Sequence, residues 1–255
     1  MRRVCVLGML ALLAAPRPAL AQHAAPRTAD SIIARAIAAR GGLARLEAIR
    51  TERLIGRIAF DPGAEGVDTV ELARPMRVRT TVVMNGKTLV QAYDGRVAWT
   101  VNPFQGITTP QVMPPDAAKN VAAGADIDGP LIDYAAKGNR ITVAGVDTAD
   151  GRPAYKLTVT TAIGVVDHYY IDTTSYLQTK WDGARTVNGQ AVVFESYFRD
   201  YRAVDGVMLP FRIDSDTRGR PGGQHITFEH IALDVPEPDT RFRMPATTSV
   251  PHPPR

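Results

Sequence analysis

Short runs in which apolar and polar residues alternate cover most of the chain between residues 54 and 234. A period of two places every second side chain on one face of a β-strand. Asn-Gly or Asp-Gly dipeptides, which favour the tight turns of β-hairpins, occur at residues 85–86, 94–95, 150–151, 182–183, 188–189 and 205–206. The pattern predicts an antiparallel meander with strands at 54–60, 67–73, 77–84, 88–93, 97–101, 141–146, 154–161, 165–172, 177–181, 191–201, 207–217 and 224–234.

Helical patterns precede this alternation and interrupt it once. Residues 31–40 carry one apolar stripe, follow a possible N-cap at Thr28 or Asp30, and precede two glycines. Residues 43–49 form a second short helix on the same reasoning. The interruption is a proline-rich insertion at about 103–139, in which helices are expected at 116–123 and 131–137. Its prolines argue against a central strand between 103 and 115.

A long meander with few helices must pair with a second sheet, close into a barrel or curl around something. We expect an α+β domain with a single strongly curved antiparallel β-sheet, an incomplete barrel of about 10–12 strands. The N-terminal helix and the insertion helices are expected to pack together on its concave face. No internal repeat or linker divides residues 22–245, and the proline-rich tail at 246–255 is expected to be disordered.

The first 21 residues have the pattern of a cleavable export signal. Arg2 and Arg3 precede an apolar run of 12 residues at 4–15, which is too short to span a membrane, and 19–21 are small or apolar. Cleavage is predicted after Ala21, and a periplasmic location is expected for the mature protein. No later run in the sequence is long and apolar enough for a transmembrane span.

Removal of the export signal changes the net charge and the cysteine count of the mature chain. The whole chain has 30 basic and 26 acidic residues. Three arginines leave with the signal, so the mature chain has 27 minus 26, a net charge of +1. A nucleic-acid partner is therefore not expected. Cys5, the single cysteine, also lies in the signal, which excludes disulfides and thiol chemistry from the mature chain.

The usual catalytic and metal-binding patterns are missing from the sequence. It contains no Gly-x-Ser-x-Gly motif. His225 and His230 are five residues apart on one predicted strand, so they point to opposite faces. The charges between Glu195 and Arg202 (Glu195, Arg199, Asp200, Arg202) are interpreted as a solvated sheet face with cross-strand pairs. We therefore expect no enzyme, no metal and no cofactor.

Four segments resemble the periplasmic outer-membrane lipoprotein-sorting proteins, the LolA/LolB-like superfamily. They are TLVQAYDGRVAWTVNPFQG (88–106), DGRPAYKLTVT (150–160), VVDHYYIDTTSYLQTKW (165–181) and FRDYRAVDGVMLPFRI (198–213). The resemblance covers about residues 30–245. It implies one curved sheet with helices in its hollow and non-catalytic binding of the acyl chains of a lipid or lipoprotein. Proteins of this fold also sense envelope components, so a regulatory module that binds an envelope protein is the alternative.

The expected site is an apolar groove on the concave face, covered by the helices. Trp99 is its expected anchor, because a large ring with one polar N–H suits the edge of an apolar groove. Alternation does not fix which face of each strand is concave. A monomer is expected. The expected groove residues are Leu54, Ile58, Val82, Met84, Trp99 and Val101. The expected residues of the helical plug are Ile33, Ile37, Leu131, Ile132 and Tyr134.

Overall fold

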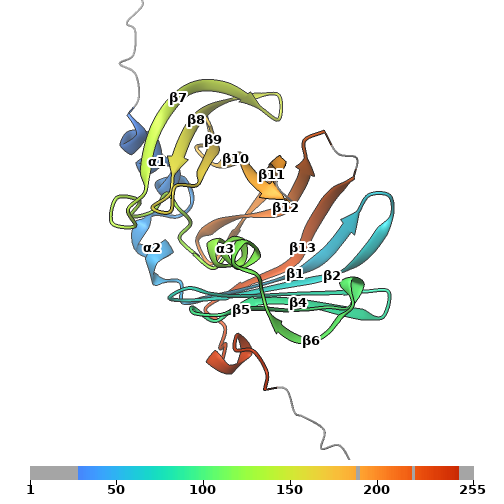
Figure 1. The fold of residues 1–255 in the computed structure, drawn as a ribbon. Helices are drawn as coiled ribbons and strands as arrows, with labels where there is room; N and C mark the ends of the chain where they lie inside the picture. Colours follow the sequence, from blue (N-terminus) through green and yellow to red (C-terminus); the bar gives the residue numbers. More distant parts are fainter. Residues whose placement is uncertain (1–27, 188–189, 220–221, 247–255) are drawn as a thin grey trace, which may run out of the picture.

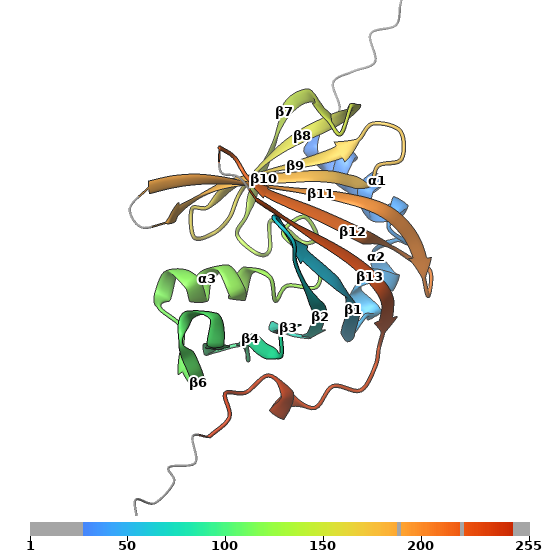
Figure 2. The same ribbon diagram turned by 90° about the vertical axis from the view of Figure 1, so that its right-hand side faces the viewer.

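The computed structural model describes residues 28–187, 190–219 and 222–246, which form one 13-stranded antiparallel sheet (Figure 1). The predicted export signal and the tail beyond residue 246 lie outside the described residues. The strand order is β6-β5-β4-β3-β2-β1-β13-β12-β11-β10-β9-β8-β7. The sheet is open and strongly curved (Figure 2). The predicted fold class is confirmed, with one strand more than the expected range.

The described strands are β1 (Thr51–Phe60), β2 (Ala64–Ala73), β3 (Arg77–Met84), β4 (Lys87–Tyr93), β5 (Ala98–Asn102), β6 (Ile107–Val112), β7 (Arg140–Ala149), β8 (Arg152–Thr160), β9 (Val166–Asp172), β10 (Gln178–Val187), β11 (Gln190–Val204), β12 (Val207–Thr217) and β13 (Gly223–Leu233). The helices among these residues are α1 (Ala29–Ala39), α2 (Leu43–Ala48), α3 (Pro115–Ala123) and the 3₁₀ helices η1 (Pro103–Gln105) and η2 (Asp239–Arg241). Thr28 caps α1, as predicted: its hydroxyl oxygen accepts a hydrogen bond from the backbone N–H of Ser31 at 3.2 Å.

One strand was not predicted, and two local predictions are wrong. The insertion contains the strand β6, which is an edge strand, so the expectation that the prolines exclude a central strand holds. Residues 131–137 form successive turns instead of a helix, with Asp133 in the left-handed region at φ 50°. Asp182-Gly183 lies inside β10 and is not a turn. A side chain at Gly183 would place its Cβ 2.0 Å from Oδ1 of Asp167, so this glycine makes room for a neighbour.

Irregular pairings bend the sheet into its curved shape. The register of β1 against β13 shifts between Ile55 and Gly56, and β7 and β10 contain similar shifts. A bulge bends its strand and increases the local twist. A Cβ at Gly56 would lie 2.2 Å from the backbone oxygen of Thr227, so the two strands can approach this closely only at a glycine.

Within the described residues, all three α-helices lie on the concave face, as predicted (Figures 1 and 2). Helix α1 packs its buried Ile32, Ile33 and Ala36 on the inward side chains of β7 to β9. Helix α2 and the turns after α3 pack with the inward apolar residues of β12 and β13, which include Phe211 and Phe228. These two clusters form most of the described hydrophobic core, and they fill the hollow beneath α1 and α2.

The convex face of β1 to β5 is covered by the segment that follows β13. Phe242 in this segment is fully buried, and its backbone oxygen accepts a 2.8 Å hydrogen bond from Nε1 of the buried Trp99. Glu237 pairs with Arg53, and Arg241 donates to Glu71 at 2.9 Å. The segment therefore forms an outer strap that holds the first and last parts of the chain together.

We predict that Phe242→Ala destabilises the protein by about 3–5 kcal/mol, the usual cost of removing a buried phenylalanine. The Trp99 emission should shift to the red, because this ring loses its cover. Chemical denaturation followed by fluorescence measures both effects. Phe104→Ala is the matched control, since Phe104 is 41% exposed. Equal effects of the two substitutions would contradict a structural role for the strap.

Candidate ligand-binding groove

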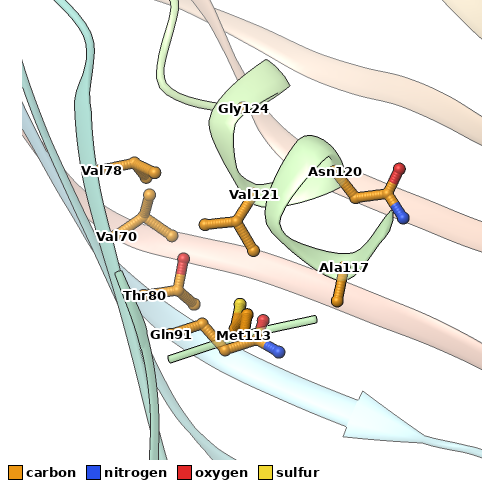
Figure 3. A pocket seen from close by; sticks show the side chains of 9 residues that line it. All are labelled: Val70, Val78, Thr80, Gln91, Met113, Ala117, Asn120, Val121 and Gly124. Carbon is orange, nitrogen blue, oxygen red and sulfur yellow. The ribbon is translucent and has the colours of Figure 1, made fainter. Parts of the chain in front are cut away.

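A pocket of about 470 Å³ lies between α3 and the concave face of β2 to β4 (Figure 3). This volume is within the range typical of small-molecule sites. Val121 points from α3 toward Val70 and Val78, which lie on the facing strands. We call this the apolar pocket; its lining residues are Val70, Val78, Thr80, Gln91, Met113, Ala117, Asn120, Val121 and Gly124.

Helix α3 is the least buried wall of this pocket. It starts with proline at its first helical position, and Ala117 and Val121 lie one turn apart on the face toward the sheet. All nine residues of α3 are described, and none of them is buried. The chain is fixed on either side of the helix instead. The N–H of the buried Met113 donates to the backbone oxygen of Ala98 at 2.9 Å. After the helix, Ala125 is fully buried.

The turns after α3 are anchored by ion pairs. Arg74 donates two hydrogen bonds of 2.6 Å to the two carboxylate oxygens of Asp128. This guanidinium lowers the pKa of the Asp128 carboxyl. Lys137 pairs with Asp126 at 2.6 Å and donates to the backbone oxygen of Gly129 at 2.8 Å. Bidentate and charge-assisted hydrogen bonds are among the stronger polar contacts, so these turns form a fixed base beneath the lightly buried helix.

A second pocket of about 450 Å³ adjoins the first at Asn120, which lines both. In Figure 3, the Asn120 side chain points away from Val70 and Val78. We call this second site the polar pocket. Its concave-face lining includes aromatic, hydroxyl, amide and ionic side chains, namely Phe60, Trp181, Arg185, Phe194, Ser196, Ser215, Thr217 and Gln224.

Two buried acidic residues of the concave face have raised pKa values. Asp68 of β2 is 1% exposed, and its Oδ1 has no hydrogen-bond partner among the described residues. Burial raises the pKa of Asp68 to about 6. Burial also raises the pKa of Glu52 to about 7, although the nearby charges of Arg40 and Arg74 act to lower it. Both carboxyls therefore hold protons more tightly in the folded chain than in the unfolded chain.

The structure brings four of the six predicted groove residues to the concave face. Leu54 and Ile58 point there from β1, and Val82 and Met84 point there from β3. Ile58 and Val82 are 3% and 7% exposed, so they form the wall of the hollow behind the pockets. None of the four lines either pocket.

Trp99 and Val101 lie on the opposite face, so the expectation that they line the groove is wrong. They pair with Ala92 and Val90 of β4, whereas Gln91 between these two lines the apolar pocket. Alternation groups Trp99 with Val101 correctly, but the strap covers this side of β5 through Phe242. The tryptophan N–H is satisfied by a backbone oxygen of the strap and is not at the edge of a groove.

The predicted plug residues do lie on the concave face, where they fill the core. Ile33 packs on β7 to β9, and Ile37 contacts both large core clusters. Ile132 is buried against β12 and β13. Leu131 and Tyr134 pack beside α1, and the Tyr134 hydroxyl donates to Asp30 at 2.6 Å. The plug therefore forms the base of the site, and the pocket lies beside it.

None of the nine residues that line the apolar pocket was among the predicted groove residues, and three of them come from the predicted helix 116–123. Ala117 and Val121 are four residues apart, and Gly124 follows at a spacing of three. This is the spacing of one helix face. The local sequence therefore contains a signal for this wall of the site.

Glu195 and Arg199 form ion pairs on the convex face, as interpreted from the sequence, whereas Arg202 lies on the concave side with its guanidinium over the Phe211 ring. Glu195 pairs with Lys180 at 3.0 Å and with Arg218. Arg199 pairs with Asp150 at 2.7 Å, and Arg202 pairs with Asp200. Within the described ranges, no group of three or more His, Cys, Asp or Glu residues is arranged to hold a metal ion. No helix in these ranges is long and apolar enough to cross a membrane.

Comparison with solved structures shows the same fold in three bacterial proteins. A DUF1329 family protein from Desulfovibrio piger has a TM-score of 0.59 at 11% identity, over 84% of this chain and 97% of that one. A putative outer-membrane lipoprotein-sorting protein domain from Vibrio parahaemolyticus has a TM-score of 0.56 at 8% identity, with coverages of 84% and 95%. A LolA superfamily protein from Nitrosomonas europaea has a TM-score of 0.53 at 15% identity, with coverages of 85% and 98%.

No family model matches the sequence, and no curated protein matches it. The fold and the site together define an open, LolA-like sheet with helices in its hollow and pockets beside α3. The fold that the sequence resemblance implied is confirmed. At sequence identities of 8–15%, these comparisons establish a shared fold and nothing more.

We predict that Asp68→Asn stabilises the protein at pH 7 and has little effect near pH 4. The raised pKa means that the folded state gains stability from protonated Asp68 at low pH, and that this gain is lost between about pH 4 and pH 6. Asparagine does not ionise, so Asp68→Asn should raise the free energy of unfolding at pH 7 by up to about 3 kcal/mol. Urea denaturation at both pH values measures it. Asp116→Asn is the exposed control, and an effect of Asp68→Asn that is independent of pH would contradict the assignment.

Proposed function

We propose that this protein is a non-catalytic binding protein for the acyl chains of a lipid or lipoprotein. The observation that carries the proposal is the apolar pocket between Val121 of α3 and the valines of β2 and β3. Burial of methylene groups contributes about 0.8 kcal/mol each, so an acyl chain can bind tightly without any charged contact. The shared fold with a putative lipoprotein-sorting domain supports this class of ligand.

The proposed location is the periplasm, and the proposed role is in outer-membrane lipoprotein sorting. Both rest on the export pattern at residues 1–21 and on the fold similarity. We predict that N-terminal sequencing of the mature protein, recovered from the periplasmic fraction, begins at Gln22. A mature chain that still begins at Met1 would contradict the export pattern.

We predict that Val121→Gln weakens the binding of a fluorescent long-chain fatty acid roughly tenfold or more. The substitution places a polar amide opposite Val70 and Val78, and a bound acyl chain would have to remove that amide from water. Titration followed by fluorescence measures the affinity. Val83→Gln is the matched control, because Val83 is 44% exposed and points to the convex face from β3. Equal weakening by both variants, or by neither, would place the acyl chain elsewhere.

Mass spectrometry of organic extracts of the native protein tests the proposal without a chosen probe. An extracted lipid that is depleted from Val121→Gln and retained by Val83→Gln would support it. Empty extracts and no fatty-acid binding would contradict it. In that case, a pull-down from envelope extracts tests the alternative, a regulatory module that binds a protein.

A further inference from the structure

Five concave side chains in the polar pocket form one row across five neighbouring strands. In this row, Trp181 pairs with Ser196, Ser196 with Ser215, Ser215 with Gln224, and Gln224 with Phe60. All five line the polar pocket. With a strand spacing of about 4.8 Å, four steps make the row about 19 Å long. It presents three hydrogen-bonding side chains between two aromatic rings.

The next concave row, two residues further along each strand, is apolar. It contains Phe198, Ile213, Ile226 and Ile58, which are again partners in register. The concave face therefore changes from polar to apolar within one step along the strands. The residues of this row line neither pocket, so the apolar end of a ligand would have to lie in the apolar pocket beyond Asn120. The residues of the polar row are only half-buried.

Arg185, the charged side chain on the concave face of the polar pocket, is already paired within the protein. Arg185 donates to both carboxylate oxygens of Asp167, at 2.7 and 3.0 Å, and its guanidinium lies 5.5 Å from the Trp181 ring centre. Gly183 leaves the space that the Asp167 carboxylate occupies. A bidentate pair of this kind satisfies both ions. The pocket therefore offers little net attraction to a phosphate or carboxylate head group.

We infer that the polar pocket binds the uncharged, hydroxyl-bearing head group of an amphiphile, a sugar or another polyol. Serine hydroxyls and the amides of Gln224 and Asn120 both donate and accept hydrogen bonds, as hydroxyl groups require. Trp181 and Phe60 provide apolar faces for the C–H surface of a ring. The acyl chain of the same molecule would continue past Asn120 into the apolar pocket. This inference rests on the proposed function.

The experiment compares probes that differ in one part at a time. Decyl maltoside, decyl phosphocholine and decanoate have a ten-carbon chain and different head groups, and maltose is the head group alone. Isothermal titration calorimetry of the purified protein, with each amphiphile below its micelle concentration, gives the affinities. We expect decyl maltoside to bind roughly tenfold more tightly than decyl phosphocholine, and maltose alone to bind much more weakly.

The decisive variant is the double substitution Ser196→Ala with Ser215→Ala. The two hydroxyls lie 2.9 Å apart and bond to each other, so removal of both leaves no orphaned group and should preserve the fold. We expect this variant to lose the preference for decyl maltoside and to bind decanoate as the unmodified protein does. Thr108→Ala with Thr109→Ala, on exposed positions of β6, is the control and should change neither.

The outcomes separate this inference from the proposed function. Equal binding of all decyl probes, or a preference that survives the double substitution, would overturn the head-group site and leave acyl-chain binding standing. Maltose binding as tight as that of decyl maltoside would also overturn it, because the site would then serve a free sugar. Failure of every decyl probe to bind would overturn the proposed function and this inference together.

Discussion

The pairing of β1 with β13 is the interaction on which the rest of the structure depends. It joins the first strand of the chain to the last, over nine residue pairs with one irregularity. As a consequence, the consecutive strands β6 and β7 become the two opposite edges of an open sheet. The chain between them has to pass from one edge to the other, and α3 lies in the hollow on this path (Figure 1). The pocket beside α3 therefore follows from the strand order.

The two faces of the sheet differ in the side chains they carry and in what covers them. An antiparallel sheet can bury one face and expose the other to water. Here the concave face needs cover along its apolar rows, and α1, α2 and the turns after α3 supply it. The convex face of β9 to β13 carries paired charges. Asp214, for example, lies 3.0 Å from Arg212 and 2.8 Å from His225, and these neighbours lower the pKa of its carboxyl.

Much of the fold was predictable because its signals are local. Asn85-Gly86 and Asp205-Gly206 do form turns, and Thr28 does cap α1. The local predictions that were wrong failed because contacts between distant segments decide the structure there. Asp182-Gly183 has the sequence of a turn, yet it lies inside a strand, where the missing side chain of Gly183 leaves space for the Asp167 carboxylate of the neighbouring strand. The turns at 131–138 are held by Asp126 and Lys137 in place of helical packing. Neither contact has a signature in the local sequence.

The candidate site was predictable only in part, for the same reason. Alternation correctly grouped Val82 with Met84, but the side on which Trp99 lies is decided by Phe242, 143 residues later. Residues chosen for their apolar character are also more often part of the core than part of a pocket. Two of the five predicted plug residues, Ile33 and Ile132, are buried in the core.

A site that admits a ligand needs a wall that packing has left incomplete. In this protein, that wall is α3, a short helix in which no residue is buried, between a fixed strand edge and an ion-paired base. Partial burial costs stability, because the apolar area of Val121 and Ala117 is not fully removed from water. An apolar ligand between α3 and the sheet would remove that area from water, so the same deficit that weakens the empty protein would contribute to binding.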